Sequence, residues 1–538
     1  MVKYIFITGG VLSSVGKGIT TASIAKLLQS SGYNVTAVKI DPYINVDAGT
    51  MNPYMHGEVY VTEDGGETDL DIGHYERFLS KNLGKHNNIT TGKVYLNVIQ
   101  RERKGDYLGK CVQIIPHITD EIKRLIREAI DRDSADIGII EIGGTVGDIE
   151  GLPFLEAIRQ MRFEDGVENT FYIHVGLIPV LETTGEQKTK PLQHSIQELR
   201  RIGIQPDMII ARSRDELTIE TIKKISLYGN IPPEMVISSH NVDTVYKVPI
   251  VLEAQEVSKK ILHRLRLEIR EVDLTDLEKY VETWDKASRN VDIAMIGKYT
   301  RLRDSYISIV EAVKHSATYE MVKPTFRWIE SSDIEGGKVD LEEALQNVSA
   351  GIILPGFGRR GAEGKIKALK LLREEGVPTL GICFGFQLMA VEYARNVLGL
   401  EGANSTEIDP NTPHPVIDLM DEQREMDRKG GTMRLGAYRI RLERNSIVYS
   451  IYNSEEIYER HRHRYEVNPR YWDKLFSDSL KPTGWSFDDR VEFIELDEKE
   501  HPFYIGTQAH PEFKSRYNNP SPVFQALLRA SLKKNLVI

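Results

Sequence analysis

Cys383, His510 and Glu512 together have the residue types of a nucleophilic catalytic site. Cys383 lies in the run Gly381-Ile382-Cys383-Phe384-Gly385, between a predicted strand and a predicted helix. Small neighbours allow the tight turn that exposes a nucleophile, and the N-terminus of a helix favours the thiolate. His510 is the predicted base. Glu512 follows it by two residues and would orient it if the segment is extended, because positions i and i+2 of a strand share a face.

Attack on an amide carbon creates an oxyanion that needs backbone N–H donors. The N–H of Phe384, directly after the cysteine, is one candidate donor. The turn Pro355-Gly356-Phe357-Gly358 supplies the other, at Gly356. The second cysteine, Cys111, has no such partners, and we expect it to be a buried small apolar residue.

The run Gly9-Gly10-Val11-Leu12-Ser13-Ser14-Val15-Gly16-Lys17-Gly18 predicts a phosphate-binding loop between a strand and a helix. Backbone N–H groups in such a loop point at phosphates, and Lys17 would reach the terminal ones. The run departs from a strict Walker A motif because the first glycine comes one place early. Gly18 also stands where Ser or Thr is usual.

Carboxylates near this loop could hold a divalent cation. Asp71 closes the run Thr68-Asp69-Leu70-Asp71, and Glu141 lies near the end of an apolar strand. An ionised group in a buried strand is costly unless it has a task. Mg²⁺ favours a few carboxylates together with substrate phosphates, so Asp71 and Glu141 are the metal candidates. Without the phosphate-binding loop, Asp69 and Asp71 would be interpreted as a solvated turn.

Further charged residues could hold a second nucleotide. Asp148 and Glu150 follow the strand that carries Glu141, and Lys188, Lys190 and Lys224 come later in the chain. Paired lysines are usually solvated, but near a phosphate-binding loop they could offset the charge of another triphosphate.

The run Arg460-His461-Arg462-His463-Arg464 has two interpretations that the sequence leaves open. A solvated face is the usual one, and a pocket for a carboxylate or phosphate is the functional alternative. The run is too short for a nucleic-acid patch.

The elements around these residues predict an α/β fold. Predicted strands alternate with helices, which is typical of parallel sheets with helices on both faces. A helix is predicted over 17–31. Strands are predicted at 3–8, 35–40, 137–142, 171–175 and 208–211, then at 291–297, 350–354, 379–383 and 506–510.

The stretch 266–289 is dense in charges of both signs, and we interpret it as a solvated linker with some helix. It divides the chain into expected domains 1–265 and 290–538. The chain has 538 residues, 41% hydrophobic and 28% charged, with a net charge of −10. A broad nucleic-acid surface and a membrane span are therefore not expected. Two cysteines exclude a disulfide framework and favour a reducing, cytoplasmic compartment.

The motifs, taken in order from Gly9 to Phe513, resemble one family closely, the CTP synthases. Beyond the residues above, the matching blocks are Asp41-Pro42-Tyr43-Ile44-Asn45, Thr62-Glu63-Asp64-Gly65, Gly73-His74-Tyr75-Glu76-Arg77-Phe78, Glu141 to Glu150 without a break, Gly431-Thr432-Met433-Arg434-Leu435-Gly436 and Arg460 to Glu466.

The resemblance implies two doubly wound α/β domains. The N-terminal one would be a P-loop amidoligase, similar to dethiobiotin synthetase, and the C-terminal one a flavodoxin-like class I glutaminase. The first would use Mg²⁺ and ATP to phosphorylate uracil O4 of UTP, and ammonia would displace the phosphate to give CTP. The second would release that ammonia from glutamine through a Cys383 thioester.

The resemblance also assigns binding residues. ATP would contact Ser14, Val15, Gly16, Lys17, Gly18, Ile19, Asp71, Arg212, His240, Asn241 and Val242, and Lys39 would touch the nucleotides. UTP, or CTP as feedback inhibitor, would contact Ser13, Asp148, Ile149, Glu150, Lys188, Thr189, Lys190, Pro191, Leu192, Gln193 and Lys224. Glutamine would contact Gly356, Phe384, Gly385, Phe386, Gln387, Glu407 and Arg464, and Mg²⁺ would bind Asp71 and Glu141.

Regulation and assembly follow from the same resemblance. GTP would activate the glutaminase, with Arg360 as a contact, and Pro53, His56 and Val59 would line an ammonia tunnel. The active form would be a homotetramer, a dimer of dimers that could also form filaments. The turn at Gly356 has one glycine fewer than the family's usual Pro-Gly-Gly-Phe-Gly. Lys104 and Asn241 stand where Arg and Asp are common.

Two other interpretations stay open at this point. The first is another glutamine-dependent amide ligase such as a cobyrinate diamide synthase, which the 188–191 and 148–150 runs disfavour. The second is a P-loop scaffold with a degenerate glutaminase, which the intact set Cys383, His510 and Glu512 disfavours.

Overall fold

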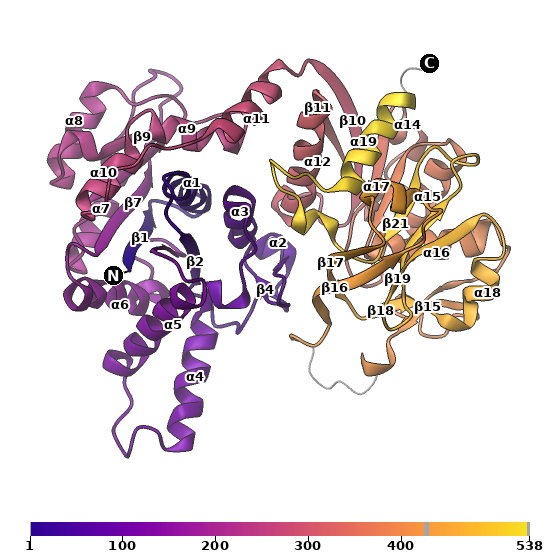
Figure 1. Cartoon of the computed structure of the whole chain (residues 1–538), viewed down its shortest axis with the longest axis horizontal. Helices are drawn as coiled ribbons and strands as arrows, with labels where there is room; N and C mark the ends of the chain where they lie inside the picture. The colour runs from indigo at the N-terminus through magenta and orange to yellow at the C-terminus, as the bar shows by residue number, and fades with distance from the viewer. Residues whose placement is uncertain (1, 424–429, 535–538) are drawn as a thin grey trace. The chain divides into compact units, whose positions relative to one another are not determined.

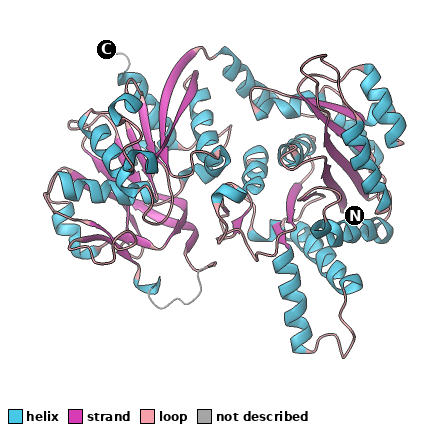
Figure 2. Cartoon of the chain, turned by 180° about the vertical axis from the view of Figure 1, so that it is seen from behind, coloured by secondary structure: helices cyan, strands magenta, loops and turns pink. Residues whose placement is uncertain are grey.

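The structure is a computed structural model that describes residues 2–423 and 430–534. The chain forms two compact units, Met1–Ala48 with Asp71–Val281, and Gly49–Leu70 with Glu282–Ile538. The sequence-based division kept residues 49–70 with the N-terminal half, whereas the structure groups this segment with the C-terminal half. Figure 2 shows that both units contain strands flanked by helices.

The first unit is built on a seven-stranded sheet in the order β5-β2-β6-β1-β7-β8-β9, and every neighbouring pair is parallel. The strands are β1 (Lys3–Gly10), β2 (Val35–Asp41), β5 (Asn88–Thr90), β6 (Ile137–Ile142), β7 (Thr170–Leu177), β8 (Met208–Ser213) and β9 (Val236–His240). The apolar runs predicted as strands are confirmed, because a parallel sheet covered on both faces requires strands that are apolar on both sides.

Helices cover both faces of this sheet (Figure 1). They are α1 (Lys17–Ser30), α3 (Leu70–Leu79), α4 (Thr91–Lys104), α5 (Thr119–Arg132), α6 (Leu152–Asp165), α7 (Lys190–Arg201), α8 (Ile219–Gly229), α9 (Val248–Glu253) and α10 (Val257–Arg264). Residues of α5, α6 and α7 complete one core with β1, β2 and β7. Helix α1 packs against β2, β6 and α9.

The second unit has a nine-stranded sheet in the order β11-β10-β12-β13-β21-β20-β19-β16-β17. The pairs from β11 to β21 are parallel and the others antiparallel. The strands are β10 (Arg289–Gly297), β11 (Val322–Glu330), β12 (Ala350–Ile353), β13 (Thr379–Ile382), β16 (Arg434–Leu442), β17 (Glu456–His463), β19 (Leu480–Ser486), β20 (Val491–Leu496) and β21 (Tyr504–Thr507). Smaller sheets pair β3 (Tyr60–Val61) with β4 (Glu67–Thr68), and β15 (Pro415–Leu419) with β14 (Asn404–Ser405) and β18 (Tyr465–Val467).

Two cores flank the large sheet, one containing α15 and α16 and the other α12, α17 and α19. The helices of this unit are α2 (Pro53–His56), α12 (Ile307–Tyr319), α13 (Ser331–Glu335), α14 (Leu341–Leu345), α15 (Ala362–Glu374), α16 (Phe384–Asn396), α17 (Ile447–Tyr452), α18 (Trp472–Leu475) and α19 (Pro522–Lys534). The fold class predicted from the sequence, two doubly wound α/β domains, is therefore confirmed.

The stretch expected to be a linker contains helix α11 (Thr275–Lys286), which crosses the division between the units. Its apolar side chains are buried: Tyr280 packs edge-on against Tyr246, and the Lys323 ammonium lies 3.8 Å from the centre of the Trp284 ring. Within residues 2–423 and 430–534, no helix is long and apolar enough to cross a membrane. Cys111 is exposed, so the expectation that it is buried was wrong.

Candidate functional site

Cys383 occupies a strained turn between β13 and α16. Its backbone has φ 51° and ψ −103°, a conformation that a side chain rarely adopts. The flanking glycines make this turn possible. A Cβ at Gly381 would lie 2.3 Å from Met389 Sδ, and one at Gly385 would lie 2.2 Å from the Ile353 carbonyl oxygen. The turn holds the Cys383 thiol at the start of a helix, as the sequence predicted.

His510 and Glu512 are joined by a hydrogen bond of 2.7 Å between His510 Nδ1 and Glu512 Oε1. Burial alone would lower the pKa of His510, but the charges of Glu512 and of the Cys383 thiolate raise it to about 10. The imidazole is therefore cationic at neutral pH, and the Glu512 carboxylate bonded to it is the first group that balances its charge.

The predicted reason for this contact was wrong, although the contact itself is present. Strand β21 ends at Thr507, and Pro511–Lys514 forms a 3-10 turn rather than an extended segment. The turn, not strand alternation, brings the Glu512 carboxylate back to the His510 ring. Proline directly after His510 favours such a helical start.

A cavity of about 660 Å³ opens onto these residues. The predicted residues that line it are Cys383, His510, Glu512, Gly356, Glu407, Arg464, Pro53 and Val59. All belong to the second unit, including the two from residues 49–70. A cavity of this size, mainly apolar with a few charged groups, suits a small polar ligand held by its ends.

The charged ends of this cavity are fixed by hydrogen bonds. Glu407 Oε1 accepts from the Gly358 N–H at 2.6 Å, and burial raises the pKa of this carboxyl group. Arg464 donates to Gln423 Oε1 at 2.5 Å. A carboxylate and a guanidinium on one cavity can bind the ammonium and carboxylate of an amino acid.

Other predicted glutamine residues do not line the cavity. Phe384 and Phe386 are buried in the core between α16 and the sheet, so their side chains are structural. Gln387 donates to the Tyr465 carbonyl oxygen at 2.9 Å and to Gln508 Oε1 at 3.1 Å. Of this group, the Phe384 N–H remains a candidate oxyanion donor because it follows the nucleophile directly.

Two lysines that the sequence analysis missed lie behind the Gly356 turn. Lys365 is buried and donates to the Leu354 carbonyl oxygen at 2.6 Å, and burial lowers its pKa strongly. Burial also lowers the pKa of Lys298, to about 8. A signal was present for Lys298, since it follows β10 directly and the carboxyl ends of parallel strands gather site residues.

The basic run on β17 is largely buried and anchors the segment 49–70. Arg460 is fully buried, and its Nε lies 2.8 Å from Glu63 Oε2. Arg462 Nε lies 2.8 Å from Glu67 Oε1, and its carbonyl oxygen lies 3.6 Å from Cys383 Sγ. The alternation of Arg and His is therefore a strand period, with arginines on the face toward 49–70. The interpretation as a solvated face was wrong.

In the first unit, the phosphate-binding loop has the backbone of an anion site. Val11, Ser14 and Gly16 have φ values of 78°, 58° and 97°, and left-handed residues of this kind occur in the backbone loops that bind anions. Lys17 is buried at the start of α1 and donates to the Gly144 carbonyl oxygen. Burial lowers the pKa of Lys17, while the charges of Glu141 and Asp71 oppose this effect.

The two predicted metal ligands meet at one ammonium group. Lys39 Nζ forms ion pairs with Asp71 and, at 2.8 Å, with Glu141 Oε1. Burial and the neighbouring Asp71 charge raise the pKa of Glu141, and the Tyr75 hydroxyl donates to its other oxygen. Paired carboxylates that already share a cation fit Mg²⁺, which would complete its shell with phosphate oxygens.

Gly18, the departure from the Walker A motif, has a steric reason. A Cβ at Gly18 would lie 1.8 Å from Asp71 Oδ1. The Asp71 carboxylate thus fills the space that a Ser or Thr side chain occupies in a strict motif.

Arg212 and residues 240–241 meet beside the loop. Arg212 donates to the carbonyl oxygens of Ser239 and His240 at 2.9 and 3.1 Å, and to Asn241 Oδ1 at 3.2 Å. A Cβ at Gly16 would lie 3.3 Å from Arg212 Nε. The structure therefore brings together the residues that the resemblance assigns to the adenine.

The candidate residues for the second nucleotide lie on two loops and two helices. The Val146 N–H donates to the Gly9 carbonyl oxygen at 2.8 Å, which ties the 145–150 loop to the phosphate-binding loop. Asp148 accepts from the Thr145 N–H at 2.9 Å, whereas Ile149 and Glu150 are exposed. Thr189, Leu192 and Gln193 are buried at the start of α7, and Lys190 and Lys224 are exposed.

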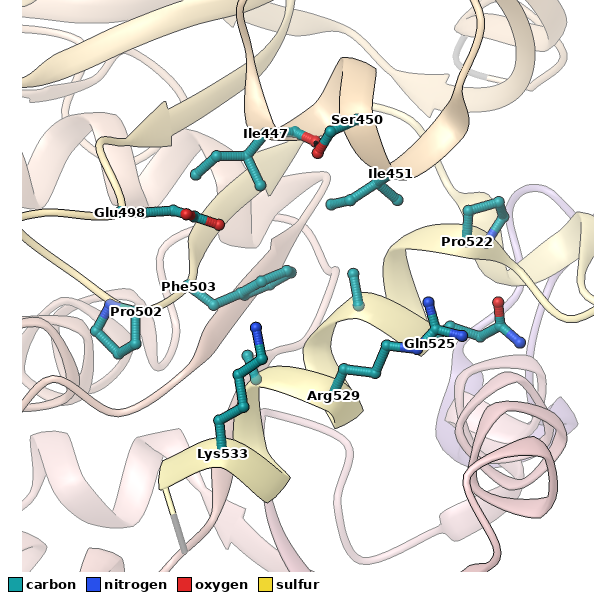
Figure 3. A pocket seen from close by; sticks show the side chains of 12 residues that line it. Ile447, Ser450, Ile451, Glu498, Pro502, Phe503, Pro522, Gln525, Arg529 and Lys533 are labelled. Carbon is teal, nitrogen blue, oxygen red and sulfur yellow. Dashed lines mark hydrogen bonds between the residues drawn. The ribbon is translucent and has the colours of Figure 1, made fainter. Parts of the chain in front are cut away.

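A second cavity in the C-terminal unit, shown in Figure 3, shares no lining residue with the one at Cys383. It lies between α17, α19 and the 498–503 loop, and Ile447, Ile451 and Phe503 form its apolar floor. None of the residues predicted for chemistry lines it.

Two family models match consecutive parts of the chain. The family described as CTP synthase N-terminus matches residues 3–267, and glutamine amidotransferase class-I matches residues 301–530. The CTP synthase of Aeropyrum pernix is 60% identical, over 98% of this chain and 98% of its own length. The CTP synthase of Sulfolobus acidocaldarius is 60% identical, over 97% of this chain and 98% of its own. Among solved structures, the Trypanosoma brucei CTPS glutaminase domain with bound acivicin is 33% identical, covering 45% of this chain and 94% of that chain with a TM-score of 0.42.

The fold and the two sites thus define a class of protein in which a class I glutamine amidotransferase is fused to a P-loop synthetase unit. The near-complete match at this identity is more specific. The chain belongs to the CTP synthase family.

Proposed function

We propose that this chain makes CTP from UTP, using ATP as the phosphoryl donor and glutamine as the nitrogen donor. One observation carries the proposal: both family matches lie on a single chain, and each unit keeps the charged and nucleophilic groups that its half of the reaction needs. The corrinoid and scaffold alternatives lose support, since the relatives at 60% identity are named CTP synthase over almost their whole length.

The glutaminase half-reaction follows from the geometry of Cys383 and His510. The Cys383 sulfur attacks the amide carbon of glutamine, and the N–H of Phe384 with the Gly356 turn would hold the oxyanion. His510 gives its proton to the leaving ammonia as the C–N bond breaks, which leaves a thioester. His510 then takes a proton from water, the hydroxide oxygen attacks the thioester carbon, and glutamate leaves. Glu512 keeps the ring oriented through its bond to Nδ1.

The synthetase half-reaction uses charge rather than a protein nucleophile. Uracil O4 of UTP takes the terminal phosphoryl group of ATP, and ADP leaves. Ammonia attacks C4 and its nitrogen loses one proton, the phosphate leaves with O4 and that proton, and CTP forms. Lys17 and Lys39 would offset phosphate charge from the base of the loop, with Asp71 and Glu141 as the magnesium ligands. Bound Mg²⁺ would neutralise charge on the transferred phosphoryl group.

The binding assignments made from the resemblance stay proposals. ATP would lie on Ser14–Ile19 with Arg212 and residues 240–242 at the base. UTP, or CTP as inhibitor, would lie against Ser13, residues 148–150, residues 188–193 and Lys224. Pro53 and Val59 support an ammonia path because they line the Cys383 cavity. Activation by GTP would involve Arg360, which donates to the Lys298 carbonyl oxygen at 2.7 Å.

We also propose a homotetramer. Large apolar side chains are exposed on the first unit, including Leu108 at 89%, Phe163 at 91% and Ile149 at 82%, which is typical of surfaces that meet a partner copy. A reducing, cytoplasmic compartment belongs to the proposal, because Cys383 must stay a free thiol to act. Light scattering with and without ATP and UTP would test the assembly.

The activity is tested by incubating the protein with UTP, Mg²⁺ and ATP, with glutamine or ammonium chloride, and with or without GTP. We expect CTP with both nitrogen donors and a GTP-dependent increase only with glutamine. If neither donor gives CTP, the assignment of UTP is wrong. If only ammonium chloride gives CTP, the shortened turn at Gly356 is the first feature to test. Inserting a glycine there should then restore the use of glutamine.

A further inference from the structure

Three buried polar side chains form a hydrogen-bonded series that connects the phosphate-binding loop to helix α7. Thr8 lies on β1, directly before the loop 9–18, and its register partner on β7 is His174. Thr8 Oγ1 lies 2.9 Å from His174 Nδ1, and His174 Nε2 lies 2.9 Å from Ser195 Oγ on α7. All three side chains are buried.

The hydrogen bonds among Thr8, His174 and Ser195 all donate in one direction along the series. The Thr8 hydroxyl donates its single proton to the Ile173 carbonyl oxygen at 3.2 Å, so it accepts from His174 Nδ1–H. His174 Nε2 then carries no proton and accepts from the Ser195 hydroxyl. Burial, together with the charge of Lys17, lowers the pKa of His174 to about 3, so the ring is neutral as this arrangement requires.

A steric contact joins the same elements independently of the hydrogen bonds. A Cβ at Gly10 would lie 1.5 Å from Ser195 Oγ and 3.0 Å from His174 Nε2. The hydroxyl of Ser195 therefore rests directly on the backbone at the first turn of the loop. Any shift of the loop at Gly10 must move Ser195, because packed interiors leave no free space between them.

The three side chains connect the phosphate-binding loop with α7, and these two elements carry the two nucleotide sites of the proposed function. The loop 9–18 follows Thr8 and contains Gly10, and α7 begins with Lys190, Pro191, Leu192 and Gln193. We propose that Thr8, His174 and Ser195 form a positioning relay, through which ATP at the loop orders α7 and tightens UTP binding. This inference rests on the proposed function, because it assumes ATP at the loop and UTP at α7.

The test measures UTP binding to the full-length protein by calorimetry, with and without a non-hydrolysable ATP analogue and Mg²⁺. In the wild type we expect the analogue to tighten UTP binding at least about fivefold. In Ser195→Ala and Thr8→Val we expect that gain to fall to within about twofold of no effect, with UTP binding alone almost unchanged. The double variant should lose no more than either single one, because both act through His174.

Controls separate the relay from a general loss of packing. Ser31→Ala removes a buried hydroxyl that donates to the Leu27 carbonyl oxygen at 3.0 Å, and Thr170→Val removes one that donates to the Gly166 carbonyl oxygen at 3.0 Å. Both should keep the wild-type gain. Thr8→Ser keeps the hydroxyl, so the ATP analogue should tighten UTP binding in this variant as in the wild type. This variant gives a folded reference even if Thr8→Val does not fold.

The inference is overturned if the wild type shows no gain, or if Ser195→Ala keeps it in full. CTP formation by the same wild-type preparation with ammonium chloride distinguishes the two levels. If CTP forms but the ATP analogue does not tighten UTP binding, only the relay is wrong. If no CTP forms, the proposed function is wrong as well.

Discussion

The two units position their reactive groups in different ways. In the proposed reaction one atom of the second unit, the Cys383 sulfur, does the covalent chemistry, and Cys383 is held in a strained turn by glycines that tolerate no side chain. In the first unit no side chain forms a bond in the proposed reaction, and the site is a cluster of opposite charges around Lys39. A nucleophile thus requires a fixed backbone, whereas phosphoryl transfer requires a balanced set of charges.

The largest expected effect separates the units completely. Cys383→Ala should lower glutamine-dependent CTP formation by at least about 10³-fold, because no other group can form the thioester. CTP formation from ammonium chloride should stay within about twofold of the wild type, since the first unit is untouched. Initial rates with each donor measure both. Equal loss with both donors would mean that the units do not divide the chemistry.

A smaller effect is expected inside the second unit from Glu512→Gln. The negative charge of Glu512 raises the pKa of His510, so its removal lowers that pKa from about 10. The alkaline limb of the pH profile for glutamine kcat/KM should move to lower pH, because His510 must be protonated to release ammonia. The rate at neutral pH should fall by about 10²-fold. An unmoved alkaline limb would show that another group controls the titration.

The corresponding change in the first unit is Glu141→Gln. Neutralising one of the two carboxylates around Lys39 should weaken Mg²⁺ affinity about 10- to 100-fold and lower CTP formation with both donors. Raising the Mg²⁺ concentration should restore part of the rate, and glutaminase activity should change little. Titration of CTP formation with Mg²⁺ measures the effect. A loss limited to the glutamine reaction would move Glu141 out of the synthetase site.

The smallest effect concerns stability rather than catalysis. Arg460→Met would break the pair with Glu63, which keeps Lys514 at 3.6 Å, and would leave the buried Val61 carbonyl oxygen without its donor, so it should destabilise the second unit by about 3 kcal/mol. Arg439→Met, which breaks an exposed pair with Glu456, should leave the unfolding midpoint almost unchanged, because solvent screens such a pair. Denaturant unfolding of both variants provides the comparison. Equal midpoints would mean that Arg460 does not anchor the segment 49–70.

The sequence predicted most of the strands and the turn that carries Cys383 because both depend on local patterns. Apolar runs such as 137–142 match β6, and the small residues around Cys383 predicted its turn. The 3-10 turn that brings Glu512 back to His510 was missed. An extended segment and a 3-10 turn both place residues two positions apart in contact, so the sequence spacing does not distinguish them. The grouping of residues 49–70 with the second unit was also missed. It depends on ion pairs between residues almost 400 positions apart, such as Arg460 with Glu63.

The most direct test of the division of chemistry compares Cys383→Ala and Glu141→Gln side by side with glutamine and with ammonium chloride. We expect Cys383→Ala to lose CTP formation only with glutamine, and Glu141→Gln to make less CTP with both donors while still releasing glutamate from glutamine. This division would be contradicted if Cys383→Ala failed with ammonium chloride, or if Glu141→Gln made CTP normally from it.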